Sequence, residues 1–507
     1  MAAVRLRGLG LVDLAARLDA RLQLLQLGPP GRHETLSTMI AWSYELLHDS
    51  QRSMMDQLSL FAGSFDLDAA GAVCDVDDLS TLLVDLVDRS MVQRVSGGVS
   101  ARLRLLESVR VFAAGRLATS GARRDTIARF VRYYDELAQR IDEGLRGPDE
   151  TAWAERLDDE LPNLEAAHAH ALHLGELDAA TRIAVAPQVF VYHRLRADAG
   201  ALAEATLPAA RRVGHPLTSA LAALVAVNRL HGGDLDGAEV LLRDLSDQPV
   251  ARHAHEVCGD LQLYRGDLEA ALLHFETAES LARELPDRFT VLHSRMSRGL
   301  TLGYLGRTAD GLQLLERVRC EASECGRSLI VTWCDFAAGE LLAESEPEQA
   351  LALVDRAVVE ADHAGWRMVA GVGRLTASSL RARSEDPADA VPGFEWLLRH
   401  WEHVGDETHQ WTTLRNLVEL LTRLGAYTPA ARLLGALGTA TRPTFGSEQR
   451  RLEAAMHTMR VHLRDELDAL IRAGAEDDLA AALELGLTAL SGLGDDHHTN
   501  RHRGAPT

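Results

Sequence analysis

The chain contains no lysine, and all 53 of its basic residues are arginine. A Walker-type phosphate-binding loop requires lysine beside its glycines, and Schiff-base catalysis requires a lysine amine. The sequence therefore excludes both kinds of site, and we predict that this chain binds no cofactor. Basic residues made up of arginine alone are typical of a GC-rich bacterial genome.

Cysteine is also scarce. Five residues, all in apolar segments expected to be helical, form no paired framework: Cys74, Cys258, Cys320, Cys325 and Cys334. This usage is typical of a reducing compartment. No run approaches the ~20 apolar residues that a membrane-spanning helix needs, and residues 1–22 show no secretory signal pattern. We therefore expect a cytoplasmic protein with no membrane association.

Aromatic residues make up only 5% of the chain, although 46% of it is hydrophobic, and alanine and leucine dominate that fraction. Such a composition favours helices packed on helices. A length of 507 residues exceeds what one hydrophobic core supports. The sequence therefore predicts several domains or an open-ended array of repeats.

Positive charge is deficient in one part of the chain. The net charge is -21, of which residues 1–145, with 17 Arg against 19 Asp and Glu, contribute only -2. The other -19 falls on residues 146–507. An acidic surface repels phosphate, so nucleic acid and acidic partners are disfavoured for that part.

The first third of the chain contains patterns for helices and one hairpin. An amphipathic helix over 11–27 ends at the breaker GPPG (28–31). The elements expected after it are helices near 35–47, 50–61, 67–74 and 78–90, then strands at 91–95 and 102–106 around Ser96-Gly97-Gly98. Asp49-Ser50 and Asp77-Asp78 are the expected N-caps. Three helices followed by a two-stranded wing predict a winged-helix domain.

From about residue 150 a turn is repeatedly followed, five positions later, by a small residue. These small residues stand at Ala238, Ala271, Gly311, Ala350, Ala390 and Ala430, at intervals of 33, 40, 39, 40 and 40. Glycine occupies the turn at Gly233, Gly266, Gly306 and Gly425, whereas Ser345 and Glu385 replace it where Pro347 and Pro387 follow. An earlier copy from Gly175 to Ala180 fits this spacing poorly.

The repeated pattern predicts helical hairpins, each made of two helices of roughly 16 residues. One hairpin cannot bury its own apolar faces, so neighbouring hairpins must stack. The expected fold is all-α, a winged-helix module followed by a TPR-like α-superhelix with a period of about 40 residues. The expected domains are 1–30, the helical end of an NTPase module; 31–120, winged helix; 121–230, helical connector and first irregular hairpins; 231–440, TPR-like repeats; 441–490, C-terminal helical cap; and 491–507, disordered tail.

An ordered series of motifs resembles a known family. The motifs are HETL (33–36), IAWSYELL (40–47), LSLFAGSF (58–65), LVDRSMV (86–92), RLLESVR (104–110), ELPNLEAA (160–167) and AARLLG (430–435). In this order they resemble the part that follows the nucleotide-binding domain in actinobacterial STAND-type (NB-ARC-like) transcriptional regulators of the SARP- and LuxR-associated kind. The resemblance covers about residues 1–490.

In that family a P-loop ATPase acts as a nucleotide-gated switch, a winged helix holds it closed, and TPR-like repeats sense a ligand or partner. Residues 1–30 resemble only the last helices of that ATPase. The family's MHD motif, whose histidine contacts ADP, aligns with Leu105-Leu106-Glu107. Leucine cannot donate that hydrogen bond, so the resemblance implies no nucleotide sensing through this motif.

Several other chemistries find little support. The helix at 78–90 would present Ser80, Thr81, Asp85 and Asp88 to DNA, and Arg89 is its only basic residue. The pairs Arg102/Arg104 and Arg123/Arg124 could contact phosphates. The histidines close in sequence are His168/His170/His173, His253/His255 and His497-His498, and neither they nor Cys320/Cys325 have zinc-site spacing. No nucleophile elbow or catalytic constellation is present.

We therefore predict a non-catalytic regulatory or sensor protein without catalytic, cofactor-binding or metal-binding residues. It would act in transcriptional control by binding a protein or small-molecule ligand on the concave face of its repeats. One alternative is a fragment of a larger P-loop ATPase regulator that has no independent activity. A direct DNA-binding repressor is a further alternative.

Overall fold

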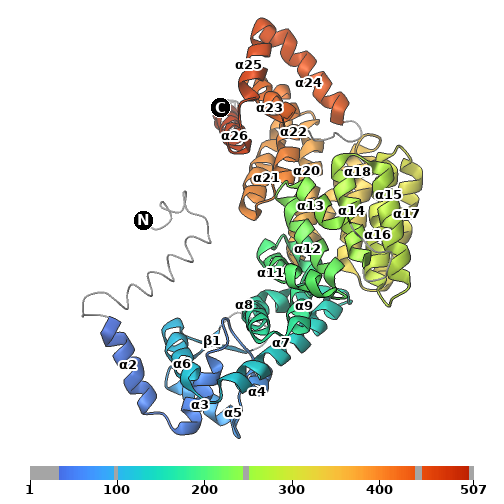
Figure 1. The fold of residues 1–507 in the computed structure, drawn as a ribbon. Coiled ribbons are helices and arrows are strands. Elements are labelled where there is room, and N and C mark those ends of the chain that lie inside the picture. The colour runs from blue at the N-terminus through green and yellow to red at the C-terminus, as the bar shows by residue number, and fades with distance from the viewer. Residues whose placement is uncertain (1–32, 96–100, 244–250, 440–447, 502–507) are drawn as a thin grey trace. The chain divides into compact units, whose positions relative to one another are not determined.

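The computed structural model describes residues 33–95, 101–243, 251–439 and 448–501 (Figure 1). The expected helix over 11–27, the NTPase-like segment 1–30 and the turn Ser96-Gly97-Gly98 lie outside these ranges. The chain divides into two compact units, one of residues 1–134 and 159–170 and the other of residues 135–158 and 171–507.

The first unit is helical with one hairpin. Its elements are α2 (His33–Glu45), α3 (Asp49–Leu58), α4 (Leu67–Val73), α5 (Leu79–Asp88), β1 (Val92–Val95), β2 (Arg102–Leu105), α6 (Glu107–Thr119) and parts of α7 (Arg123–Leu145) and α8 (Glu150–Leu174). The strands pair antiparallel, from Val92 opposite Leu105 to Val95 opposite Arg102. Phe65, between α3 and α4, forms an isolated bridge with Leu103.

Local side-chain caps explain where the helices of this unit begin. Asp66 accepts a hydrogen bond from the Ala69 amide at 2.8 Å, and Asp78 accepts one from the Thr81 amide at 3.2 Å, as expected for N-caps. The predicted cap at Asp49-Ser50 is wrong by one position. His48 precedes α3, and its amide donates to the Gln51 side chain at 2.9 Å, so Asp49 already belongs to the helix.

The second unit contains the remaining parts of α7 and α8 and a further series of helices. They are α9 (Leu177–Val185), α10 (Gln188–Arg194), α11 (Ala197–Val213), α12 (Thr218–His231), α13 (Leu235–Leu242), α14 (Arg252–Arg265), α15 (Leu268–Arg283), α16 (Arg288–Tyr304), α17 (Thr308–Glu324), α18 (Ser328–Leu342), α19 (Pro347–Ala364), α20 (Arg367–Ala382), η3 (Pro387–Ala390), α21 (Val391–Val404), α22 (Glu407–Arg423), α23 (Tyr427–Thr439), α24 (Glu448–Leu463), η4 (Arg464–Glu466), α25 (Leu467–Gly474) and α26 (Leu479–Arg501). The all-α superhelix of stacked hairpins is therefore confirmed.

Within this unit the first helices of successive hairpins form an inner layer. Each of α12, α14, α16, α18, α20 and α22 contacts the next first helix as well as its own partner helix. The stacked helices α14–α18 are seen side by side in Figure 1. The inner helices are buried at many positions, so their side chains form the core and the walls of any cavity on this layer.

The six small residues from Ala238 to Ala430, which we call the ladder, lie where two helices of a hairpin pack closely. All six lie within the first turn of a hairpin's second helix or of η3, which precedes α21, and all are buried. A Cβ atom at Gly311 would lie 2.5 Å from the Gly299 carbonyl oxygen of α16. The glycines at the turns adopt left-handed backbone conformations, with φ from 78° at Gly425 to 82° at Gly306. Close helix approach thus requires the small residue.

The sequence analysis did not identify the turn of one hairpin, the one formed by α10 and α11. Between α10 and α11 the left-handed turn position is held by Leu195, with φ of 55°, and not by glycine. Gly200 follows five residues later and packs against Asn228, whose side-chain nitrogen would lie 2.4 Å from an added Cβ. The poorly fitting copy at Gly175 is also a real turn, since Gly175 has φ of 79° and Ala180 is buried.

The C-terminal region is helical beyond the expected limit. Helices α24, α25 and α26 occupy the segment predicted as a helical cap. Helix α26 continues to Arg501, so the tail expected to be disordered over 491–507 is helical as far as that residue. Within the described residues no helix combines the length and apolarity needed to cross a membrane.

Candidate ligand-binding cavity

A cavity of about 510 Å³ opens on the inner layer of the second unit. Its walls come from first helices of successive hairpins, α14, α16, α18, α20 and α22, together with Tyr192 of α10 and the first turn of α24. A volume of this size falls in the range that holds a small organic ligand. The cavity exists because helices about 40 residues apart in sequence converge on the same space.

Aromatic side chains form much of the apolar wall. Tyr192, Tyr264, Tyr304, Trp333 and Phe336 all line the cavity. The rings of Trp333 and Phe336 meet edge to face with centroids 5.6 Å apart. The Trp333 indole N–H is bound elsewhere, because it donates to the His193 ring at 3.2 Å. Flat aromatic walls suit an aliphatic chain or a cation.

A carboxylate and an imidazole hold Tyr264 in place. Its hydroxyl lies 3.0 Å from Nε2 of His409, and Nδ1 of His409 lies 2.8 Å from Oδ2 of Asp406. Burial alone would raise the pKa of Asp406, but His409 and His231 hold it below its usual value. The His409 ring also stacks on Trp401 with centroids 4.7 Å apart. This chain of contacts joins α14 to α22 and fixes the phenol against the cavity.

The arginines at the α24 side of the cavity have carboxylate partners. Arg415 Nε lies 3.0 Å from Glu448, and Arg451 contacts both Glu344 at 3.2 Å and Glu419 at 3.1 Å. Arg383 also pairs with Glu344. Their charges are therefore used in ion pairs between the helices that form the wall.

Two other carboxylates in the wall have no such cation. Glu340 accepts hydrogen bonds from the Thr376 hydroxyl at 2.6 Å and the Tyr304 hydroxyl at 3.4 Å, both neutral donors. Asp260 is half-buried, and within the described residues no hydrogen bond or ion pair reaches its side chain. Burial raises the pKa of Asp260 to about 7, because His293 offsets that effect only in part and Glu256 adds to it.

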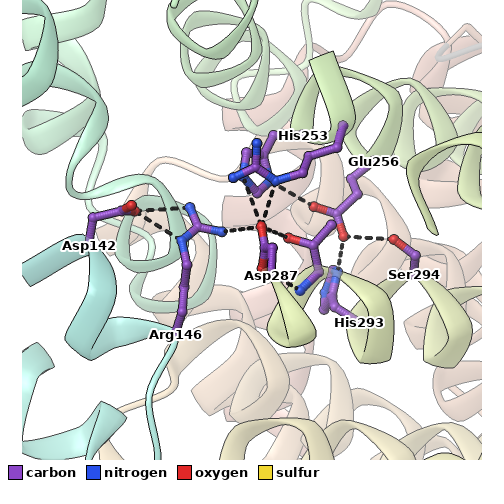
Figure 2. Close-up of polar contacts among 9 residues, drawn as sticks. Asp142, Arg146, His253, Glu256, Asp287, His293 and Ser294 are labelled. Carbon is purple, nitrogen blue, oxygen red and sulfur yellow. Dashed lines mark hydrogen bonds and ion pairs between the residues drawn. The ribbon is translucent and has the colours of Figure 1, made fainter. Parts of the chain in front are cut away.

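A buried polar cluster adjoins the cavity through His293, which lines the cavity wall (Figure 2). Glu256 lies at its centre. Its carboxylate accepts from Nδ1 of His253 at 3.1 Å, from Nδ1 of His293 at 3.0 Å and from the Ser294 hydroxyl at 3.0 Å. Burial would raise the pKa of Glu256, but the hydrogen bonds from the two histidines lower it to about 2.

Asp287 is the second centre of the cluster. Arg146 contacts it at 3.2 Å and Arg252 at 2.5 Å, and the Thr290 hydroxyl donates to it at 2.9 Å. Arg146 also contacts Asp142 at 3.0 Å (Figure 2). Through Asp142 and Asp287, Arg146 links the end of α7 to the start of α16. Although burial opposes ionisation, Arg146, His253 and Arg252 hold the pKa of Asp287 well below its usual range.

The charges of this cluster balance when His293 is protonated. Burial lowers the pKa of His293, yet its hydrogen bond and ion pair with Glu256 outweigh that effect and raise it. The three carboxylates then face three cations: Asp142, Glu256 and Asp287 against Arg146, Arg252 and His293. When His293 is protonated its charge is therefore paired with Glu256, and Asp260 has no cation of its own within the described residues.

The histidines considered as metal ligands do not converge. His168 is buried, His170 is half-buried against the Phe130 ring and His173 is exposed, so they occupy different faces of α8. His253 bonds to Glu256, whereas His255 faces His274, with 3.2 Å between ring nitrogens. The side chains of His497 and His498 lie outside the described part. The structurally described residues contain no group of three or more potential ligands that could hold a metal ion.

The cysteines are all free, but their surroundings differ from the expectation. Cys74, Cys258 and Cys334 are buried, whereas Cys320 is exposed and Cys325 is half-buried. The apolar setting predicted for all five is therefore wrong for Cys320. It lies on the outer face of α17, where its thiol contacts Glu316 at 3.4 Å.

Arg102 was expected to be available for phosphates, and this is wrong. It is buried and donates to the Ser64 hydroxyl at 2.8 Å and to Glu160 at 2.9 Å. Asn163 completes the contact by donating to the Ser64 carbonyl at 2.7 Å. These contacts join the segments FAGSF (61–65) and ELPN (160–163) within the first unit.

The other arginines that could contact phosphates are exposed to solvent. The polar residues in and next to α5 are exposed too, except Asp85. Arg104, Arg123 and Arg124 are exposed, as are Ser80, Thr81, Asp88 and Arg89. Asp85 is half-buried and accepts from Gln51 at 2.9 Å. Leu106 precedes α6 and is 39% exposed.

The sequence analysis named Gly306 as a turn glycine, but it predicted no cavity residue as a ligand contact. The cavity's polar residues are spread over several helices, with Asp260 on α14, Glu340 on α18 and His409 on α22. One signal could have found them, namely polar side chains at inward positions of first helices that are otherwise apolar. Without the superhelix it cannot be known that these positions share one space.

Comparison with known proteins gives partial relatives. No protein-family model matches the chain. A protein of Mycobacterium tuberculosis, named "Putative HTH-type transcriptional regulator", is 30% identical over 325 residues, which is 59% of this chain. Its counterpart in Mycobacterium bovis matches equally. An uncharacterised M. tuberculosis protein is 33% identical over 157 residues, covering 29% of this chain and 40% of its own length.

The first two relatives are much longer than the matched region. The chain covers 36% of the length of these regulators. These two relatives are named as HTH-type transcriptional regulators, and the match spans about a third of the length of each.

Two solved structures are similar at low identity. One is a signal transduction ATPase with numerous domains (STAND) protein with a tetratricopeptide repeat sensor from Pyrococcus horikoshii, with a TM-score of 0.46 and 11% identity, covering 93% of this chain and 66% of that one. The other is a Rap protein complexed with competence and sporulation factor, with a TM-score of 0.42 and 13% identity, covering 64% of this chain and 91% of that one.

Proposed function

We propose that the chain is a non-catalytic sensor in transcriptional control, in which the repeats bind a ligand in the cavity of the inner layer. The observation that carries this proposal is the cavity itself. Its walls are joined by contacts such as Tyr264–His409 and Arg415–Glu448, which link helices α14, α22 and α24 around this space. The homologous regulators supply the link to transcription.

The first unit supports the finer part of the proposal. Helices α3, α4 and α5, the bridge at Phe65 and the hairpin β1–β2 occur in the order of a winged-helix module. Asp88, at the end of α5, and Arg89, directly after it, are both exposed, and Arg89 is the only basic residue of this segment. Arg102 is engaged with Glu160. We therefore propose that this module docks on protein, as in the STAND regulators of the SARP- and LuxR-associated kind, and does not bind DNA directly.

The bonding in the cavity supports the proposal of a non-enzymatic role. Asp406, His409 and Tyr264 are arranged as a carboxylate–imidazole–phenol series, but the histidine is occupied by the phenol it positions. The buried thiol Cys258 is not a nucleophile, because burial raises its pKa to about 12. We propose that Asp406, His409 and Tyr264 shape the cavity and carry out no chemistry.

Transcript profiling tests the regulatory role. A strain lacking the gene would be compared with strains complemented by wild type, by Thr412→Trp or by Val240→Trp. Thr412 lines the cavity, whereas Val240 is 59% exposed on α13. We expect a defined set of transcripts to change in the deletion strain. Wild type and Val240→Trp should restore them, and Thr412→Trp, which fills the cavity, should not. Unchanged transcripts in the deletion strain would reject the function.

A gel-shift experiment separates this role from direct repression. The chain is expected not to shift duplex DNA from its own promoter region at about 0.15 M salt, because its charge is -21 and its repeats repel phosphate. A saturable, sequence-dependent shift would support the repressor alternative.

A further inference from the structure

We propose that the cavity binds a small aliphatic diamine, with one ammonium group on Asp260 and the other on Glu340. The inference rests on the proposed function, since it names the ligand class of the same cavity. Neither carboxylate has a cationic partner within the described residues, and both line one enclosed space.

Asp260 supplies the first half of the argument. A half-buried carboxylate without a hydrogen-bond donor is unfavourable, because it loses water and gains nothing in return. The charged groups that act on it are His293 and Glu256, and His293 already donates to Glu256 at 3.0 Å. No arginine acts on Asp260 in the way that Arg146 and Arg252 act on Asp287. An ammonium group of a ligand would supply the missing positive charge.

Glu340 supplies the second half. Thr376 and Tyr304 orient its carboxylate by donating hydrogen bonds, but neither carries a positive charge. The other carboxylates of the wall differ in this respect. Glu344 and Glu448 are paired with arginines. A cation entering the cavity therefore meets two carboxyl groups, Asp260 and Glu340, that have no paired arginine within the described residues.

The lining between these groups suits a methylene chain. Met296, Leu300 and Phe336 add apolar surface to the rings of Tyr264 and Trp333. An ammonium group near such rings is further stabilised by their negative faces. A cavity of about 510 Å³ is large enough for a diamine of several carbons. Anionic ligands are disfavoured because Arg383, Arg415 and Arg451 of the wall already form ion pairs with carboxylates. The fourth arginine of the wall, Arg450, is exposed.

The test is calorimetric titration of the full chain with a homologous series from 1,3-diaminopropane to 1,8-diaminooctane. The comparison compounds are 1-aminobutane, 1,4-butanediol and N-acetyl-lysine amide. We expect one diamine length to bind saturably with a single site per chain. The diol should not bind, and the monoamine should bind about tenfold or more weakly, since it loses one charge-assisted contact.

Variants locate the binding. Asp260→Asn and Glu340→Gln keep side-chain size and remove one charge each, and each should lower diamine affinity by about tenfold or more. Glu340→Gln should also reduce the difference between the diamine and the monoamine. Glu269→Gln, an exposed carboxylate outside the cavity on α15, is the matched control and should bind as wild type. Thermal melting of each variant separates loss of binding from loss of fold.

Three outcomes would overturn the proposal. They are the absence of saturable binding by any diamine, unchanged diamine affinity in Asp260→Asn, or binding of N-acetyl-lysine amide in preference to every diamine, which would assign the cavity to a peptide. The two proposals can fail separately. Regulated transcripts without diamine binding would reject only this inference, and diamine binding without any transcript change would reject only the regulatory function.

Discussion

At the residue scale, the fold depends on buried charges that are bonded on several sides. Asp287 illustrates this, since it receives Arg146, Arg252 and Thr290 and also lies at the start of α16. Removing one member of such a group leaves another charge buried without its partner, which is much costlier than losing an exposed ion pair.

Arg146→Met is therefore expected to lower the free energy of unfolding by about 3 kcal/mol, because Asp287 and Asp142 lose a shared cation. Arg319→Met removes an exposed pair with Glu316 at 2.9 Å and is the matched control, with an expected change below about 1 kcal/mol. Urea unfolding measures both. Equal effects of the two substitutions would show that the cluster adds no more than a surface pair.

Buried histidines give the protein a predictable pH dependence. Burial lowers the pKa values of His193, His231 and His253, and lowers those of His168 and His400 to about 4. Because the unfolded chain then binds more protons, stability is lost as pH falls below about 6.5 towards the folded-state pKa values. His293, whose pKa is raised, opposes this trend.

We expect the urea concentration at the midpoint of unfolding to decrease when the pH is lowered from about 7.5 to about 5. Each such histidine contributes up to about 1.4 kcal/mol per pH unit to this loss of stability. His400→Phe should make the urea midpoint depend less on pH. The substitution keeps a ring stacked on Trp396, whose centroid lies 4.4 Å from that of His400. Phenylalanine has no proton to bind in the unfolded state. An unchanged slope in this variant would contradict the assignment of His400 as a neutral buried group.

At the element scale, the spacing between helices is set by small residues. The ladder from Ala238 to Ala430 could be read from the sequence because it repeats at a nearly constant interval. The α10–α11 hairpin could not, since Leu195 adopts the left-handed conformation that usually requires glycine. A single residue that departs from local preference is invisible to pattern analysis, because only packing reveals what holds it.

Gly311→Ala is expected to destabilise the chain by about 2 kcal/mol, because its Cβ would lie 2.5 Å from the Gly299 carbonyl and force α16 and α17 apart. Gly438→Ala, in α23, meets nothing within 4 Å and should stabilise by up to about 1 kcal/mol through lower chain entropy. Thermal or urea unfolding compares the two. Stabilisation by Gly311→Ala would mean that the ladder does not set the helix spacing.

At the scale of the whole repeat unit, distant hairpins contact one another directly. Tyr264 meets His409, and the Thr408 hydroxyl donates to the Leu230 carbonyl at 2.6 Å, across 145 and 178 residues of chain respectively. In an open array each repeat contacts only its neighbours. Contacts between α12 or α14 and α22 should instead make the second unit cooperative.

Hydrogen exchange can measure this cooperativity. His409→Phe keeps a ring against Trp401 but loses the bond to Tyr264, so amides of both α14 and α22 should exchange faster. Amides of α17, on the outer layer, serve as the internal control and should change less. Faster exchange confined to α22 would indicate that the hairpins open independently, as in a one-dimensional array.

The amino-acid sequence by itself determined the helical hairpins, the register of six of them and the order of elements in the first unit, because turns, caps and small residues act locally. It also excluded a P-loop through the absence of lysine. Only the tertiary structure decided that Arg102 is buried on Glu160, and that Asp260 and Glu340 face one cavity. The physical reason is that curvature of the superhelix brings together side chains from repeats far apart in the chain, and no local pattern encodes that curvature.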